Sequence, residues 1–279
     1  MATMTPTTGA VFIPEVWAND ILTARRNKLV ASNLVNHQYE SNLSYGDTVH
    51  IVSIAAMTAD AITPGTALVP VAPTETEQTL VIDQYYGKAI EVQDMLKRQS
   101  KYDLRRPYTD EMGFAIAKAM DSSLLNQYAN AASGHTQTAV ASLTFNGIVD
   151  ATTLLDSKNV PMEDRALIVN AVSLGDLRKL PEFTAYDSTG RTGVREKSMG
   201  IVGSIYGADV YLSNQVPSAG GSYKNLLLHK DAIAMAVQMR PDTESDRDIL
   251  KRADILSIAA LWGVKTIRPD HMVVLQRTV

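Results

Sequence analysis

Residues 48–86 read TVHIVSIA AMTADAITPGTALVPVAPTETEQ TLVIDQYY, and this stretch decides how the chain is organised. Its two ends are rich in β-branched and aromatic residues, which predicts one strand over 48–55 and another over 79–86 that continues to residue 92. The segment between them holds three separate prolines, and its longest apolar run is only Ala67-Leu68-Val69. Loops of this length inside compact domains are uncommon. We therefore expect a long β-hairpin with a proline-rich tip, which projects from the body and needs a partner surface.

Charge is unevenly distributed around this hairpin. From Leu29 to Gly87 the chain has no Lys or Arg but six acidic residues, whereas residues 97–106 carry five basic residues and one acid. Like charges on one arm repel each other, but an acidic segment that docks on a neighbour's basic segment gains from the segregation. On charge alone, a contact between subunits and chance variation on a solvated face explain the pattern equally well.

A long helix is predicted after the basic segment. Apolar residues recur at helical spacing from Tyr108 to Ala131, with Asp121 outside the apolar stripe. The helix is expected to begin near Pro107 and to stop at Gly134. About 25 residues at 1.5 Å per residue give a length of about 38 Å, so the helix would run across the molecule.

The remainder of the chain predicts mixed α and β structure. Residues 1–14 are rich in Thr and Ala and are expected to form an extended arm. Within 145–240, helical and strand patterns alternate, with strands expected over 165–169, 207–213 and 226–228. The last residues predict three short strands, over 254–258, 264–268 and 272–275.

Composition excludes several classes of protein. With 279 residues, of which 45% are hydrophobic, the chain can bury a core without covalent staples. The absence of cysteine excludes a disulfide framework, a thiolate zinc site and a cysteine nucleophile. A net charge of −4 does not favour tight nucleic-acid binding by counterion release. No secretory signal and no apolar run of about 20 residues is seen, so we expect a protein kept in a reducing cytoplasm and not in a membrane.

Motifs that carry chemistry are missing. The sequence has no phosphate-binding loop and no nucleophile elbow, and its five histidines form no metal-ligand motif. Asp242, Glu244, Asp246 and Asp248 alternate as in a calcium loop, but Arg247 stands at the glycine position, so we interpret them as a solvated turn. We therefore expect no catalytic residue, metal or cofactor; an enzyme, such as a hydrolase using Asp and His, has no support in the spacing.

Several stretches occur in a characteristic order along the chain. They are YGDTVHI (45–51), NVP (159–161) with RALIVN (165–170), GSIYGADVYLSNQVP (203–217), LHKDA (228–232) and WGVK (262–265). This ordered set spans nearly the whole chain and resembles the major capsid (coat) protein family of tailed bacteriophages, which shares the Hong Kong 97-type capsid fold. The resemblance implies an α+β fold whose copies form hexamers and pentamers of an icosahedral shell around double-stranded DNA, in the virion, assembled in the host bacterial cytoplasm.

The family's organisation can be carried onto this chain. It implies an N-terminal arm (1–46), an extended loop (47–87), a peripheral domain with the spine helix (88–143), an axial domain (144–232) and a return to the peripheral domain (233–279). Some members crosslink a loop lysine to a neighbour's asparagine, but no Lys lies between Lys28 and Lys88, so we expect no such crosslink. About fourteen residues precede Pro14, so a separate scaffolding protein is expected, besides a portal protein, an optional decoration protein and weak, non-specific contact with packaged DNA.

The charge pattern then predicts a specific contact between subunits. We expect the acidic loop residues to lie over a neighbour's basic segment: Asp60, Glu75 and Glu77 on one side, and Lys97, Arg98, Lys101, Arg105 and Arg106 on the other. Two alternatives remain open. One is an encapsulin-like nanocompartment shell protein, and the other is a different phage structural part such as a tail tube protein.

Overall fold

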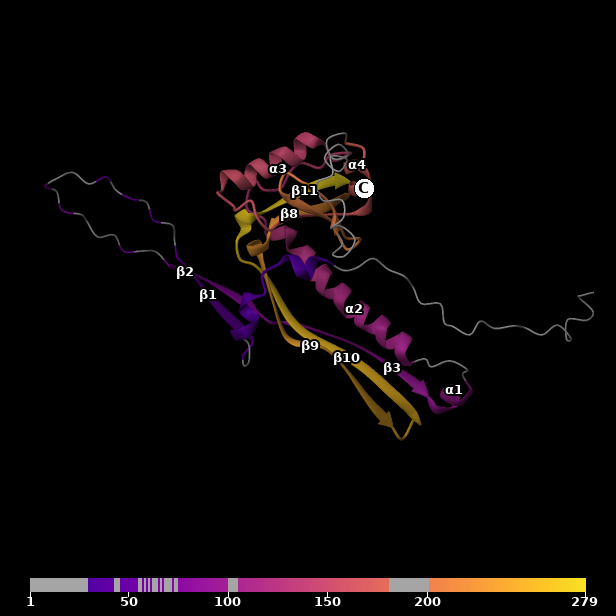
Figure 1. Ribbon diagram of the computed structural model, residues 1–279. Helices are drawn as coiled ribbons and strands as arrows, with labels where there is room; N and C mark the ends of the chain where they lie inside the picture. The colour runs from indigo at the N-terminus through magenta and orange to yellow at the C-terminus, as the bar shows by residue number, and fades with distance from the viewer. Residues whose placement is uncertain are drawn as a thin grey trace, which may run out of the picture.

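The computed structural model describes residues 30–42, 46–54, 57, 59, 61, 65, 67, 72, 75–99, 105–180 and 201–279. Figure 1 shows three parts: an α/β lobe, a long sheet with a helix along it, and a hairpin that projects sideways. No helix in the described ranges is long and apolar enough to span a membrane.

The projecting part is the predicted hairpin. Strand β1 (Thr48–Ile54) pairs antiparallel with β2 (Glu75–Val81), from Thr48 opposite Val81 to Ile54 opposite Glu75. The backbone N–H of Ile82 donates to the Asp47 carbonyl at 2.8 Å and closes the hairpin base. Gly263 packs so closely there that a Cβ atom would lie 2.3 Å from the Val81 carbonyl oxygen, so only glycine fits.

The hairpin ends earlier than the sequence predicts. The expected strand over 79–92 is two strands, because the chain breaks after β2 and continues as β3 (Gln84–Gln93) in another sheet. Ile82, between them, is buried with Leu80 and Ala234. Residues 84–87 therefore belong to the body and not to the projecting loop, for which we had expected 47–87.

The long sheet has the strand order β3-β10-β9, all antiparallel. Strand β9 spans Ile233–Asp248 and β10 spans Ala253–Thr266. Two predictions were wrong here. The acidic residues Asp242 to Asp248 form part of β9 and not a turn, and the two short strands expected over 254–268 are one continuous strand, because pairing with β3 and β9 holds β10 extended along its length.

The helix along this sheet is α2 (Arg105–Leu125). It ends sooner than Gly134, because the chain tightens into the 3-10 helix η4 (Asn126–Asn130). Its buried residues Met112, Ile116, Met120 and Leu124 follow the predicted stripe and share a core with Leu256 and Ile258 of β10.

The α/β lobe is built on a six-stranded sheet of order β11-β8-β4-β6-β5, with β7 beside β8. Its strands are β4 (Arg165–Val169), β5 (Ile201–Ile205), β6 (Ala208–Leu212), β7 (Ser218–Ala219), β8 (Ser222–His229) and β11 (Met272–Thr278). Helices α3 (Phe145–Ser157) and α4 (Ala171–Leu177) pack on it. We expected 233–279 to return to the peripheral domain, but β11 pairs with β8 here, since that apolar strand is buried by pairing at the sheet edge.

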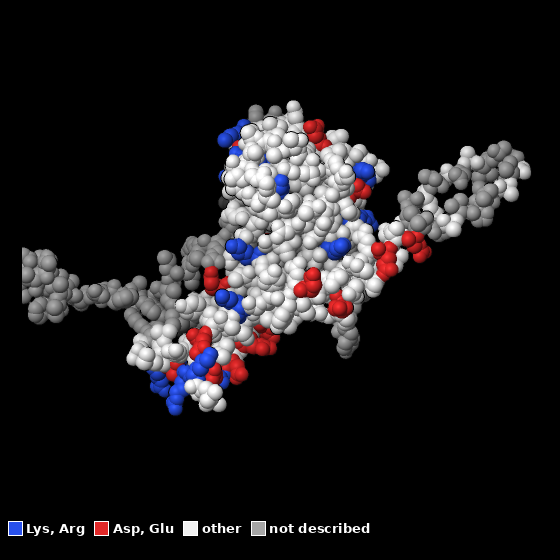
Figure 2. Space-filling view, turned by 180° about the vertical axis from the view of Figure 1, so that it is seen from behind, with Lys and Arg blue, Asp and Glu red and all other residues white. Residues whose placement is uncertain are grey.

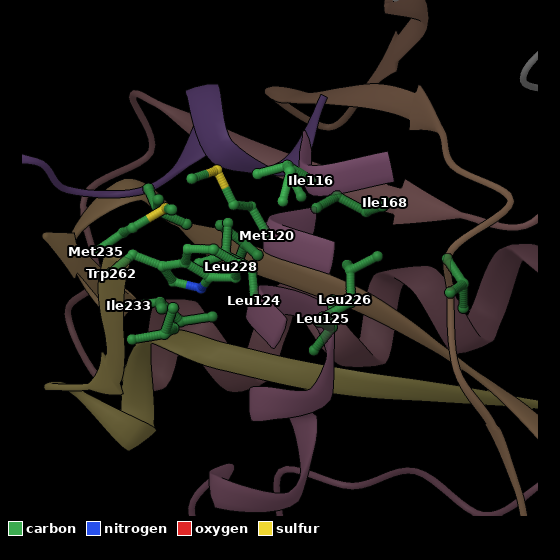
Figure 3. Close-up of a cluster of buried hydrophobic side chains, with 14 of the residues drawn as sticks. Ile116, Met120, Leu124, Leu125, Ile168, Leu226, Leu228, Ile233, Met235 and Trp262 are labelled. Atoms are coloured by element: carbon green, nitrogen blue, oxygen red, sulfur yellow. The ribbon is translucent and has the colours of Figure 1, made fainter. Parts of the chain in front are cut away.

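One hydrophobic core joins the lobe to the long sheet (Figure 3). The indole of Trp262 in β10 is completely buried, stacks on Tyr86 at 5.1 Å, and donates through Nε1 to Ser123 Oγ of α2 at 3.1 Å. The same core contains Ile168 of β4 and Leu226 and Leu228 of β8. The end of α2 is therefore packed against both sheets.

Candidate assembly interface

One face of the hairpin packs on the body and the other faces solvent. Side chains alternate along a strand, so Ile51 and Leu80 point to one face, where they are buried with Ala234 and Ala236. The opposite face carries three apolar side chains with large exposed fractions: Val52 63%, Ile54 68% and Val81 45%.

Two of the three predicted acidic residues, Glu75 and Glu77, lie on this same solvent-exposed face. Glu75 is opposite Ile54, and Glu77 is opposite Val52. The carboxylate of Glu77 contacts the imidazole of His50 across the strands. We call Val52, Ile54, Val81, Glu75 and Glu77 the hairpin face.

The basic segment begins in the short helix α1 (Asp94–Gln99), which follows β3. Lys97 and Arg98 stand in its last turn, next to two exposed apolar side chains, Met95 at 65% and Leu96 at 50%. We call Met95, Leu96, Lys97 and Arg98 the α1 patch. It therefore combines apolar and basic side chains, as the hairpin face combines apolar and acidic ones.

Ion pairs hold the α1 patch on the long sheet. Lys97 Nζ donates to Asp254 Oδ2 at 2.8 Å, and Arg247 Nη2 donates to Asp94 Oδ2 at 2.6 Å and through Nη1 to Asp254 Oδ1 at 3.2 Å. The hydrogen bond from Arg247 lowers the pKa of Asp94. The main-chain N–H of Asp94 also donates to the Arg252 carbonyl at 3.0 Å. These contacts fix the position of the α1 patch, and Lys97 is already paired with Asp254 of its own subunit.

One subunit does not bring the two surfaces together. The hairpin and α1 lie at opposite ends of the molecule (Figure 1). Figure 2, which views the molecule from behind, shows acidic groups at the hairpin base and mixed charges at the other end. Of the other predicted contact residues, Asp60 and Lys101 lie outside the described residues. Arg105 and Arg106 form the first residues of α2, and their side chains are likewise outside the description.

Sequence reasoning missed the apolar half of both surfaces. It singled out Glu75, Glu77, Lys97 and Arg98 by charge and did not name Val52, Ile54, Met95 or Leu96. Strand alternation could have identified Val52 and Ile54, because residues one and three positions after the buried Ile51 point to the opposite face of the strand. The apolar residues of α1 had no such signal, since a helix of six residues has too short a pattern to show which face is buried.

A buried carboxylate, Asp121, was also missed. Its side chain in α2 is 1% exposed and accepts backbone N–H groups from Val30 at 3.0 Å, Ala31 at 3.3 Å and Ser32 at 3.2 Å. Burial raises the pKa of Asp121, and the three hydrogen bonds act in the opposite direction. Asp121 thereby satisfies the first N–H groups of the 3-10 helix η2 (Ala31–Leu34) and holds residues 30–32 on α2.

A cavity of about 350 Å³ lies beside the hairpin base. It is lined by β1 residues 51–54, by Asn36, Gln38 and Tyr39, and by Asp231, Ile267 and Arg268. Among the described residues no group of three or more His, Asp or Glu side chains could hold a metal ion.

Comparison with known proteins agrees with an assembly role. The model of a family described as phage capsid protein matches residues 75–275. No curated protein matches the sequence significantly. A chain from Mycobacterium phage Che8 superposes with a TM-score of 0.78 and 27% identity, covering 94% of this chain and 96% of that one. The capsid of Cyanophage P-SCSP1u gives 0.77 at 19% identity, with 97% and 94% covered, and the capsid of a native GTA particle gives 0.72 at 11% identity, with 100% of both chains covered.

Proposed function

We propose that copies of this chain assemble as hexamers and pentamers into an icosahedral shell around double-stranded DNA. The premise is that the chain belongs to the phage capsid protein family and is a major capsid protein of a tailed bacteriophage. The observation that carries this proposal is the family match over most of the chain, together with a fold shared end to end with phage capsid chains. The protein is located in the capsid of the virion, and we propose that the shell assembles in the host cytoplasm. The same family match supports a structural role, and we propose that the chain has no catalytic activity.

The contact we propose between subunits joins the hairpin face of one copy to the α1 patch of the next. Each surface offers exposed apolar side chains, whose burial contributes about 25 cal/mol per Å². Each surface ion pair contributes about 0–1 kcal/mol, so Glu75 and Glu77 mainly set the register against Lys97 and Arg98. We include Asp60, Lys101, Arg105 and Arg106 in this contact on the basis of their charge and their place in the sequence.

Other partners follow from the role of a shell wall. A scaffolding protein would guide assembly, a portal protein would occupy one vertex, and a decoration protein is an optional external partner. Contact with DNA is weak and non-specific, because the chain has a net charge of −4 and packaged DNA must slide along the wall.

Electron microscopy of the overexpressed chain, with and without a scaffolding protein, tests the assembly. We expect closed shells; rings or helical tubes would instead favour a tail tube protein. Nucleic acid inside particles purified from infected cells supports a phage capsid, whereas enclosed enzymes would favour an encapsulin-like compartment.

The subunit contact is tested by reversing charge in the basic segment. The double substitution Arg105→Glu and Arg106→Glu should abolish shells while circular dichroism shows a folded subunit. The matched control is Lys118→Glu, at an exposed position farther along α2, which should still assemble. Intact shells from the double variant would refute the proposed pairing.

A further inference from the structure

Two neighbouring turns connect the long sheet to the α/β lobe. Strand β8 continues through η5 (Lys230–Ala232) into β9, and β10 continues through η6 (Pro269–His271) into β11. The turns lie side by side where the lobe meets the long sheet (Figure 1). The backbone N–H groups of Ile267 and Arg268 both donate to the Ala232 carbonyl, at 2.9 and 3.1 Å. A change in the angle between the two sheets must therefore move these turns.

Two imidazoles meet at this joint. The rings of His229 and His271 are edge to face, with centroids 5.7 Å apart. His229 Nδ1 accepts the backbone N–H of Asp231 at 3.2 Å, which caps η5 and requires that nitrogen to be unprotonated. His271 Nδ1 is buried and has no hydrogen-bond partner among the described residues. In the neutral tautomer that carries its hydrogen on Nε2, Nδ1 has a lone pair and no hydrogen, so the present packing fits this neutral form better than the protonated ring.

We propose that His271 is a proton-operated latch, which holds the two turns together when neutral and loosens the joint between the sheets when protonated. Protonation places a new N–H at buried Nδ1, where the described residues offer no acceptor. A buried donor without a partner is costly, so η6 must move until that nitrogen reaches water. The added positive charge also lies near Arg268 and His229, which oppose it.

The nearby carboxylates of Asp231 and Asp270 favour the protonated ring, but both are already engaged with other groups. Asp270 Oδ1 is already shared between His135 Nε2 and Lys158 Nζ, at 3.8 Å from each. Asp231 Oδ1 accepts a hydrogen bond from Asn36 Nδ2 at 3.0 Å. Taken by element, the titratable or charged groups around the histidine pair are Lys230 and Asp231 on η5, Arg268 and Asp270 at η6, Arg165 on β4 opposite His229, His135 before α3, and Lys158 at the end of α3.

The direction of the pH dependence follows from these contacts. Burial, Arg268 and His229 lower the pKa of His271 below its ordinary value of 6.5, against the opposite pull of Asp231 and Asp270. A histidine whose pKa is lower in the folded state stabilises the fold at pH values above 6.5. This contribution is lost as the pH falls through the folded-state pKa. Acid therefore opens the joint.

Hydrogen exchange on the unassembled full-length subunit tests the latch. Between pH 7.5 and 5.0, after correction for intrinsic exchange rates, protection of residues 229–235 and 267–273 should fall about tenfold in the unmodified chain. His271→Phe keeps an aromatic ring without a titrating nitrogen and should abolish that fall. His50→Phe, on the hairpin, is the matched control and should leave it intact. An equal loss of protection in His271→Phe would overturn the proposal.

A second measurement does not depend on the variant folding. NMR titration of the unmodified subunit, with histidine labelled at Cε1, should give His271 a midpoint below 6.5 that coincides with exchange broadening of signals from the two turns. A midpoint at or above 6.5, or a titration without changes in the turns, would contradict the latch.

Discussion

Helix α2 and the β1–β2 hairpin differ in how their apolar side chains are covered. The stripe of α2 is buried within the subunit, against Trp262 and both sheets. On the hairpin, Ile51 and Leu80 are covered, but Val52 and Ile54 remain more than 60% exposed. The helix is therefore covered by its own chain, whereas the described residues leave one face of the hairpin uncovered, and we propose that another copy covers it.

The largest expected effect concerns the core against which helix α2 packs. Trp262→Ala removes a fully buried indole at the point where α2 meets both sheets, so the free energy of unfolding should fall by about 3–5 kcal/mol. Urea denaturation of the unassembled subunit measures this. Tyr85→Ala, which truncates a side chain that is 68% exposed, is the control and should change stability little. Equal stability of the two variants would contradict the assignment of the core.

A smaller loss is expected where Asp121 accepts the N–H groups of residues 30–32. Asp121→Ala leaves three backbone N–H groups of residues 30–32 without their acceptor, which should cost about 1–3 kcal/mol. Exchange of these amides should rise, together with a lower urea midpoint. Asp110→Ala, at an exposed position on the same helix, should change neither; unchanged exchange in Asp121→Ala would mean that the cap does not hold the segment.

On the hairpin, substitution should affect assembly and leave folding unchanged. Val52→Asp with Ile54→Asp puts charge on the uncovered face, so shells should be lost, while the free energy of unfolding of the subunit, from urea denaturation, changes by less than about 0.5 kcal/mol. A clear loss of subunit stability would show that this face is covered by its own chain.

Charge exchange sharpens the same contact. Glu75→Lys with Glu77→Lys should reduce the yield of shells, and adding Lys97→Glu with Arg98→Glu should restore part of it. Rescue should be incomplete, because Lys97 also pairs with Asp254 of its own subunit. If no ionic strength gave rescue, the two charge clusters would not be in contact with each other in the shell.

The smallest expected effect concerns that internal ion pair. Lys97→Ala should lower subunit stability by at most about 1 kcal/mol, because the Lys97 side chain is half exposed. Added salt should remove much of the difference in urea denaturation between variant and unmodified chain. A larger, salt-independent loss would show that the pair is structurally essential.

The sequence predicts elements well where local pattern and tertiary packing agree. Strand β1 is rich in β-branched residues, β4 is a short apolar run, and the α2 stripe has a clear helical period, so all three were expected close to their true places. The acidic end of β9 has no apolar pattern at all, and only pairing with β10 makes it a strand. The partner sheet of β11 is likewise set by long-range pairing with β8, which no local pattern encodes.

The candidate interface was only half predictable for a related reason. Runs of like charge are visible in the sequence, so Glu75, Glu77, Lys97 and Arg98 were found. Whether an apolar residue is exposed depends on what packs against it, so Met95 and Leu96 became visible only in the structure. Asp121 was not expected to be buried because its hydrogen-bond partners lie about 90 residues earlier in the chain.

Hydrogen exchange of the hairpin before and after assembly tests the central claim most directly. Backbone amides of residues 48–54 and 75–81 should exchange rapidly in the isolated subunit and become strongly protected in shells, while amides of α2 are protected in both states. Equal protection of the hairpin in subunits and shells would contradict the view that a neighbouring copy covers it.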